Sequence, residues 1–213
     1  GYKNLMKLVT AGYLEGFYYR PRVDIELLRQ YNDGLICMSA CLKGEVPEKM
    51  LKGDYEGGKE AALIFSEIFP DRYYLEIQNH GIPEEEANIQ NMKKLSAELN
   101  LPLVCSNDAH YAKQDHSEAH DIHICLGTGK ERSDPNRLRY ATPEFYFKSQ
   151  DDMHKLFKEF PQAIENTRRI ADSIDMTLPR GESHLPNFPI PEGAPTRDPD
   201  EYLKILVQKG AES

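Results

Sequence analysis

Short runs of apolar residues alternate along this chain with segments in which apolar residues recur at helical spacing. The helical spacing predicts helices over residues 2–16, 25–31, 46–52, 55–69 and 83–99. The apolar runs predict buried strands over residues 35–39, 72–78 and 101–106. Helices placed between successive strands are typical of parallel strands joined by right-handed crossovers. The pattern therefore predicts an α/β fold with a parallel sheet.

The pattern changes after residue 110. Helical spacing returns over residues 116–126, 150–159, 161–174 and 200–210. Residues that commonly cap helices precede three of the predicted helices: Asp24, Asp115 and Ser149. Residues 179–200 hold six prolines, which favours an extended connector. We therefore expect one domain over residues 1–178, followed by a connector and the first helix of a further region over residues 179–213.

Composition narrows the class of protein. The formal net charge is −9, which disfavours this surface as a main nucleic-acid clamp, because phosphate binding needs clustered Lys and Arg. No apolar stretch reaches about 18 residues, so no membrane span is expected. Residues 1–15 are amphipathic and do not form a signal peptide. The four cysteines form no CxxC pair, which favours reduced, cytosolic thiols.

Potential metal ligands follow each of the three predicted strands. Cys41 follows the first strand, His80 follows the second, and Asp108 and His110 follow the third. The carboxyl ends of parallel strands meet at one edge of a sheet, so we expect these side chains to lie at the same edge. Asp108 and His110 are two residues apart, so in extended backbone their side chains leave the same face. Thiolate, imidazole and carboxylate groups are ligands of divalent metals.

Each of these residues also has an ordinary structural interpretation. A cysteine near a strand end is usually a small buried hydrophobe, and a histidine before a glycine is often a turn residue. An Asn-Asp pair after a strand commonly stabilises a turn or caps a helix. Glu76 in the second strand is a further possible ligand, although a strand carboxylate is more often solvated or paired. Because possible ligands follow all three strands, the metal-site interpretation and the structural interpretation are about equally supported.

Two other groups of residues invite a functional interpretation that we rank second. His116, His120 and His123 share one helix face, which more often packs at a domain edge than binds zinc. The aromatic and arginine residues between 17 and 22 could stack on bases, but an interdomain contact fits the acidic chain better. There is no Gly-rich phosphate loop, no G-x-S-x-G elbow and no paired-aspartate polymerase motif. Any polymerase chemistry would have to lie outside this chain.

Several motifs resemble, in order, the bacterial replicative DNA polymerase III α subunits. These motifs are GYLEGFYY at residues 12–19, LICMSACLKGE at 35–45, YLEIQNHGIP at 74–83, SNDAHY at 106–111, the segment 119–130, and LPNFP at 185–189. The resemblance covers nearly the whole chain. It implies a partial, distorted (β/α)7 barrel of the PHP (polymerase and histidinol phosphatase) type, followed by a C-terminal helical and Pro-rich extension that leads to the polymerase palm region.

The resemblance also implies roles for individual residues. Cys41, Asp108 and His110 match metal ligands of the family, and His80 and Glu76 are secondary candidates. The implied cofactors are zinc or manganese at this site, and magnesium at a polymerase site outside the chain. The implied activity of the PHP site is 3′–5′ exonucleolytic proofreading. The implied partners are DNA, the sliding clamp and a proofreading subunit, in the bacterial cytoplasm and with no membrane partner.

The chain departs from the family pattern in one respect. The His-x-His motif and the His and Glu motifs that follow it are absent from this sequence. We therefore expect an incomplete ligand set, and a chain that is inactive by itself. One alternative is a non-catalytic structural and partner-docking domain. Another is a free-standing phosphoesterase, against which the proline-rich connector argues.

Overall fold

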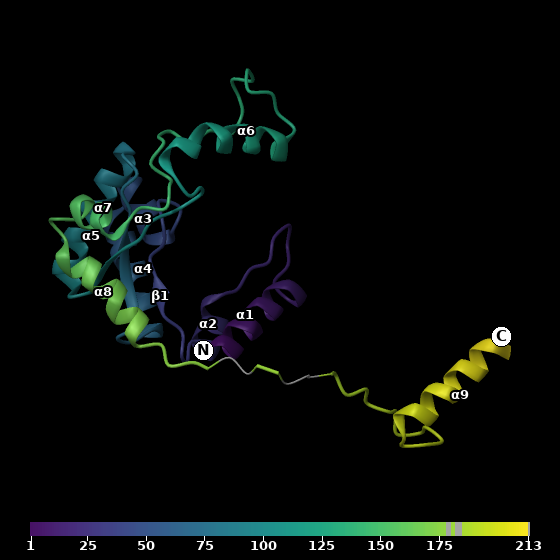
Figure 1. Ribbon diagram of the computed structural model, residues 1–213. Coiled ribbons are helices and arrows are strands. Elements are labelled where there is room, and N and C mark those ends of the chain that lie inside the picture. Colours follow the sequence, from purple (N-terminus) through teal and green to yellow (C-terminus); the bar gives the residue numbers. More distant parts are fainter. Residues whose placement is uncertain (178–179, 182–184, 213) are drawn as a thin grey trace. The chain divides into compact units, whose positions relative to one another are not determined.

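The computed structural model describes residues 1–177, 180–181 and 185–212 (Figure 1). These residues separate into two compact units, one over residues 1–174 and one that starts at residue 175. The domain boundary predicted at residues 178–179 lies outside the described residues. No helix in the described part of the chain is long and apolar enough to cross a membrane.

A small parallel sheet organises the first unit. Its strands are β1 (Cys37–Met38), β2 (Tyr73–Ile77) and β3 (Leu103–Cys105), hydrogen-bonded in the order β1-β2-β3. Cys37 pairs with Tyr73, and Leu75 pairs with Leu103, in parallel register. The prediction of an α/β fold with parallel strands is thereby confirmed. Each strand is shorter than its apolar run, and within the described residues the ladder ends at β1 on one side and at β3 on the other.

Helices account for most of the remaining structure. Their bounds are α1 (Tyr2–Leu14), α2 (Ile25–Tyr31), α3 (Glu45–Leu51), α4 (Tyr55–Ile68), α5 (Pro83–Leu99), α6 (Ser117–Thr128), α7 (Gln150–Leu156), α8 (Pro161–Asp172) and α9 (Pro199–Glu212), with a 3₁₀ turn η1 (Gln114–His116) before α6. Each of these α-helices lies where the sequence predicts helix, with ends that differ by a few residues. The largest shift is at α7, which ends at Leu156 rather than at residue 159.

The core of the first unit lies between β2 and the helices that flank it. Tyr73, Leu75 and Ile77 alternate along β2 and are at most 2% exposed, while Tyr74 and Glu76 between them are half-buried. The helices contribute further fully buried side chains: Val46 from α3, Ala62 from α4, and Met92 and Leu95 from α5. Burying one large aliphatic side chain contributes roughly 1.5–3 kcal/mol, so β2 is the most strongly anchored of the three strands.

Local side chains define the helix ends. Asp24 accepts a hydrogen bond from the Leu27 backbone N–H at 2.9 Å, and Ser149 forms a capping box with Asp152. Both predicted caps are therefore confirmed. The third prediction is wrong, because Asp115 lies inside the 3₁₀ turn η1 and His116 occupies the N-cap position of α6. The extra turn shifts the start of α6 by one residue, from 116 to 117.

The second unit consists of a connector and one helix. Arg197 donates hydrogen bonds to the backbone carbonyls of Pro191 and Glu192 at 3.3 and 3.0 Å, which folds the connector against the start of α9. Phe188 stacks on Tyr202 of α9, with ring centroids 6.2 Å apart. The Pro-rich segment thus has local order where it approaches the helix.

Candidate functional site

His80 lies three residues after the end of β2 and is one of the most deeply buried side chains, with 1% of its surface exposed. Its Nδ1 lies 2.7 Å from Oε1 of Glu85, and its backbone N–H donates to Oε2 of the same carboxylate at 2.5 Å. Glu85 is in the first turn of α5 and is itself 4% exposed. The pair therefore ties the end of β2 to the start of α5.

The carboxyl group of Glu85 is ionised despite its burial. Burial by itself would raise the pKa of this group, but hydrogen bonds from the ring and backbone N–H of His80 outweigh that effect. The net result is a pKa below the usual glutamate value. Glu85 is therefore a carboxylate at neutral pH and acts only as an acceptor toward His80.

The other ring nitrogen of His80 faces the end of β3. His80 Nε2 accepts a hydrogen bond from the backbone N–H of Asp108 at 3.3 Å, so the ring proton lies on Nδ1 and is donated to Glu85. The ring stacks on Phe145 at 4.3 Å with an interplanar angle of 3°, and the Thr142 hydroxyl donates to the His80 carbonyl at 2.6 Å. Both ring nitrogens of His80 are thus engaged within the protein.

Asp108 and His110 come together at the end of β3, as their spacing predicts. His110 Nε2 lies 3.1 Å from Asp108 Oδ1, and both side chains remain partly open to solvent. The backbone N–H of His110 donates to the carbonyl of Phe145 at 2.8 Å, which fixes the turn that carries the pair. A carboxylate oxygen and an imidazole nitrogen therefore stand side by side at the edge of the sheet.

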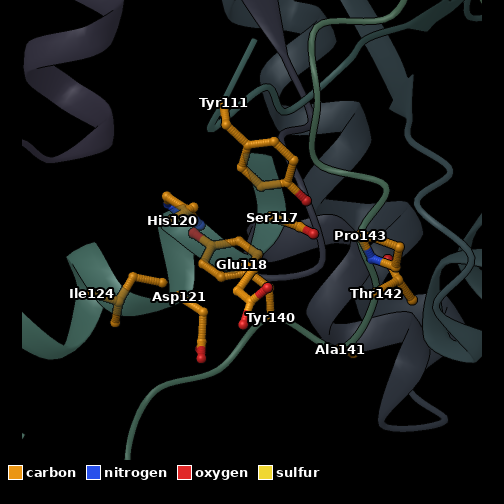
Figure 2. Close-up of a pocket in the computed structure, with 10 residues that line it drawn as sticks. All are labelled: Tyr111, Ser117, Glu118, His120, Asp121, Ile124, Tyr140, Ala141, Thr142 and Pro143. Carbon is orange, nitrogen blue, oxygen red and sulfur yellow. The ribbon is translucent and has the colours of Figure 1, made fainter. Parts of the chain in front are cut away.

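Aromatic side chains from two other segments surround His110. The hydroxyl of Tyr140 lies 3.1 Å from His110 Nε2, and the two ring centroids are 4.7 Å apart. The ring centroid of His120, in α6, lies 5.7 Å from that of His110 and 5.2 Å from that of Tyr140. Figure 2 shows His120 beside Tyr140. The pKa of His120 is lowered mainly by burial and further by the charges that His110 and His123 would carry when protonated. The lowered pKa keeps the His120 imidazole neutral at neutral pH. We call His80, Asp108, His110, His120, Tyr140 and Phe145 the strand-end cluster.

A cavity of about 250 Å³ opens beside the strand-end cluster, between α6 and residues 140–143 (Figure 2). Arg137 holds the loop that leads into this wall, because its guanidinium binds both carboxylate oxygens of Asp121 in α6 at 2.5 and 2.7 Å. The Arg137 side chain is 4% exposed, although the loop itself lies at the surface. This bidentate pair ties the loop that precedes Tyr140 to α6, the helix that carries His120.

The remaining predicted ligands lie apart from the Asp108–His110 pair. Cys41 is exposed in the turn after β1, where its carbonyl accepts a hydrogen bond from the Gly44 N–H at 2.8 Å. Glu76 accepts hydrogen bonds from the Ser106 hydroxyl and, at 3.3 Å, from the Gln78 amide. Within the described residues, no group of three or more His, Cys, Asp and Glu side chains is placed to hold a metal ion. The described residues thus offer two adjacent donors, Asp108 and His110.

The other cysteines differ from Cys41 in their surroundings. All four thiols are free, and burial raises the pKa of Cys37 and Cys105 to about 11. Those two thiols are therefore protonated at neutral pH and serve as small core residues. Cys41 is the most exposed of the four cysteines, which leaves it as the thiol that can reach a ligand.

Sequence reasoning missed two members of the strand-end cluster and one partner of His80. Tyr140 and Phe145 carry no recognisable motif, and Glu85 reads as one of three acidic residues at the start of a helix. The sequence places His120 on a polar helix face with His116 and His123. Its place on that face could be read from the sequence, but the distance from α6 to the end of β3 could not.

The sequence of this chain is similar to a known domain family and to several known proteins. The PHP domain family matches residues 1–80, a segment that ends at His80. The chain is 45% identical over 213 residues to the DNA polymerase III subunit alpha of Borreliella burgdorferi, with 99% of the chain and 18% of the relative covered. The corresponding proteins of Treponema pallidum and Thermus aquaticus are 43% and 36% identical, again over 99% of the chain and 18% of each relative. The chain thus spans less than a fifth of the length of these relatives.

Proposed function

This chain belongs to the family of bacterial DNA polymerase III α subunits, and from that premise we propose that it is part of the PHP region of a replicative, DNA-directed DNA polymerase. The polymerase chemistry and its magnesium ions belong to parts of the subunit outside this chain. The three parallel strands form part of a distorted (β/α)7 barrel, with residues 1–178 in the PHP domain and residues 179–213 leading to the palm. The regular β-α-β order with parallel register supports this assignment.

Asp108 and His110 are proposed as two ligands of a divalent metal ion, and Cys41 as a third. The observation that carries this proposal is the 3.1 Å approach of Asp108 Oδ1 to His110 Nε2 at the carboxyl end of a parallel strand. Carboxylate, imidazole and thiolate donors suit zinc, and carboxylate and imidazole also suit manganese. A bound divalent ion would lower the pKa of a water molecule and stabilise negative charge on a phosphodiester.

The chain's own residues would orient these ligands. The Tyr140 hydroxyl and the rings of His120 and Phe145 restrict the His110 imidazole to one orientation. Hydrogen bonds to a ligand from its surroundings are a general means of fixing ligand geometry. The reaction we propose is hydrolysis of a DNA phosphodiester in the 3′–5′ direction, in the bacterial cytoplasm and alongside the sliding clamp and a proofreading subunit.

One observation favours a second candidate function. The described residues bring together two donors and leave Cys41 exposed in a separate turn. A PHP domain without a closed ligand set would act as a structural platform that stabilises the polymerase and docks its partners. Under this second candidate, the strand-end cluster contributes to stability alone.

Elemental analysis of the full-length subunit separates the two candidates. The test variants are Asp108→Asn and His110→Ala. The chain supplies a matched control, because Asp115 and His116 form an exposed Asp–His pair with Oδ1 and Nε2 3.9 Å apart. We expect the metal content and the release of nucleotides from 3′-labelled single-stranded DNA to fall in the test variants and to stay unchanged in Asp115→Asn and His116→Ala. Unchanged metal content in all four variants would overturn the metal-site proposal and leave the structural platform.

A further inference from the structure

We infer that His80 is a positioning residue that latches the backbone of Asp108 to the end of β2, and that it is not itself a metal ligand. The inference rests on the proposed metal site, since it assigns His80 a role in placing one of that site's ligands. Its evidence is the buried His80–Glu85 pair and the part-buried hydrogen bond from the Asp108 N–H to His80, both within the first unit.

The first argument is that His80 has no ring nitrogen left for a metal ion. Nδ1 donates to Glu85 at 2.7 Å, and Nε2 accepts from the Asp108 N–H at 3.3 Å. The ring is 1% exposed and lies flat against Phe145 at 4.3 Å. A metal ligand would need one nitrogen with a free lone pair directed at an open coordination position.

The second argument concerns what the latch holds. The regular hydrogen bonds between β2 and β3 end where the Ser106 N–H donates to the Ile77 carbonyl at 3.1 Å. Beyond that point the His80–Asp108 hydrogen bond adds one further contact between the segments that follow β2 and β3. Asp108 is the proposed ligand on this turn, and His110 follows two residues later. The latch therefore acts on the backbone that carries both proposed ligands.

The third argument is that Glu85 fixes which ring nitrogen accepts. The carboxylate can only accept hydrogen bonds, so Nδ1 of His80 must carry a proton. Nε2 is then left with its lone pair facing the Asp108 N–H. Carboxylate–histidine pairs fix the tautomer of metal-ligating histidines in the same way. Here the pair directs the histidine at a backbone amide.

Two substitutions separate the two hydrogen bonds of the His80 ring, the one donated to Glu85 and the one accepted from the Asp108 N–H. In His80→Asn the side-chain amide nitrogen takes the place of Nδ1 and can donate to Glu85, but the side chain is too short to reach Asp108. In His80→Gln the terminal amide lies near the position of Nε2 and its oxygen can accept from the Asp108 N–H, while the donor to Glu85 is lost. We expect His80→Asn to lower the metal affinity of the full-length subunit by roughly 10–100-fold, as loss of a ligand-orienting partner does, and His80→Gln to retain most of it.

Thermal unfolding should show the opposite order. His80→Gln leaves the Glu85 carboxylate without its ring donor, whereas His80→Asn keeps that donor. We therefore expect the larger drop in unfolding temperature in His80→Gln. If His80→Gln does not fold, the double substitution His80→Gln with Glu85→Gln removes the buried charge and takes its place in the comparison.

Hydrogen–deuterium exchange of the metal-free subunit tests the latch without reference to metal. We expect the peptide that contains residues 106–111 to exchange faster in His80→Asn and at the wild-type rate in His80→Gln. This result, together with a wild-type subunit that holds no metal, would overturn the proposed function and uphold the latch. Unchanged exchange in His80→Asn would overturn the latch. An equal loss of metal in both variants, with unchanged exchange, would instead identify His80 as a ligand.

Discussion

The buried carboxylate of Glu85 accepts hydrogen bonds from both the ring Nδ1–H and the backbone N–H of His80. It stands between Glu84 and Glu86 in the first turn of α5, and both of those neighbours are exposed. The helix dipole favours all three carboxylates at this position, but Glu85 alone lies on the face that packs against the end of β2. A single acidic residue thereby fixes the entry of α5, the end of β2 and the tautomer of His80.

Replacing Glu85 tests this arrangement directly. We expect Glu85→Gln to lower the free energy of unfolding by about 1–3 kcal/mol, because a buried N–H donor of His80 loses its acceptor. Glu84→Gln is the matched control, since it removes a charge from the same helical turn at an exposed position. Urea unfolding of the two variants measures the difference. Equal stability of the two variants would show that the His80–Glu85 hydrogen bonds add nothing to the fold.

The same pair gives stability a dependence on acid. The pKa of Glu85 is lower in the folded protein than its usual value, so its ionised form stabilises the fold at pH values above the unfolded pKa of about 4.3. That contribution is lost as the pH falls through the folded pKa. We therefore expect the stability gap between the wild type and Glu85→Gln to be constant near neutral pH and to narrow below about pH 4. Unfolding curves between pH 3 and pH 7 measure this gap, and a gap that widens in acid would contradict the assignment.

Leu75 occupies the centre of the core. It lies in the middle of β2, pairs with Leu103 across the sheet, and is fully buried. We expect Leu75→Ala to destabilise the first unit by about 2–5 kcal/mol through lost burial and the cavity left behind. Leu63→Ala on α4 is the control, because Leu63 is 43% exposed and should cost much less. Denaturant unfolding compares the two, and a similar loss in both variants would contradict the placement of the core.

The sequence predicts the parts of this structure that depend on neighbours along the chain. The range Pro83–Leu99 of α5 matches the prediction, because a proline at the first helical position and a left-handed Asn100 after the last mark its ends. The prediction at Asp115 fails for a local reason, since the chain makes one 3₁₀ turn before α6 begins.

The candidate site is predicted only in part, because it depends on distances between elements. The two-residue spacing of Asp108 and His110 is enough to predict that their side chains meet at the end of a strand, as they do. The approach of His120 depends on how α6 packs, and the inward turn of Glu85 depends on which face of α5 meets β2. Hydrophobic periodicity determines which face of a helix is buried, but it does not determine which polar side chain on another element that face meets.

The capping box at the start of α7 gives a prediction on a smaller scale. Ser149 Oγ accepts from the Asp152 N–H at 3.2 Å, and Asp152 accepts from the Ser149 hydroxyl at 2.7 Å. We expect Ser149→Ala to cost about 1 kcal/mol, the usual value for loss of an N-cap. Ser149→Thr should keep most of the stability, because threonine can make the same hydrogen bond. Thermal unfolding of both variants measures the effect, and equal losses would show that the hydroxyl is not what stabilises this helix.

Arg137 offers a way to disturb the wall of the strand-end cluster without touching its members. The guanidinium of Arg137 donates to both carboxylate oxygens of Asp121. The exposed Arg132 approaches Asp121 only with Nε, which lies 3.6 Å from Oδ2. Lysine cannot reproduce the two parallel hydrogen bonds. We therefore expect Arg137→Lys to loosen residues 130–140, with faster proteolysis in this loop and altered fluorescence of Tyr140, while Arg132→Lys leaves both unchanged. If Arg137→Lys behaves as Arg132→Lys does, charge alone holds the loop, and the position of Tyr140 beside His110 must be set by ring packing within the strand-end cluster.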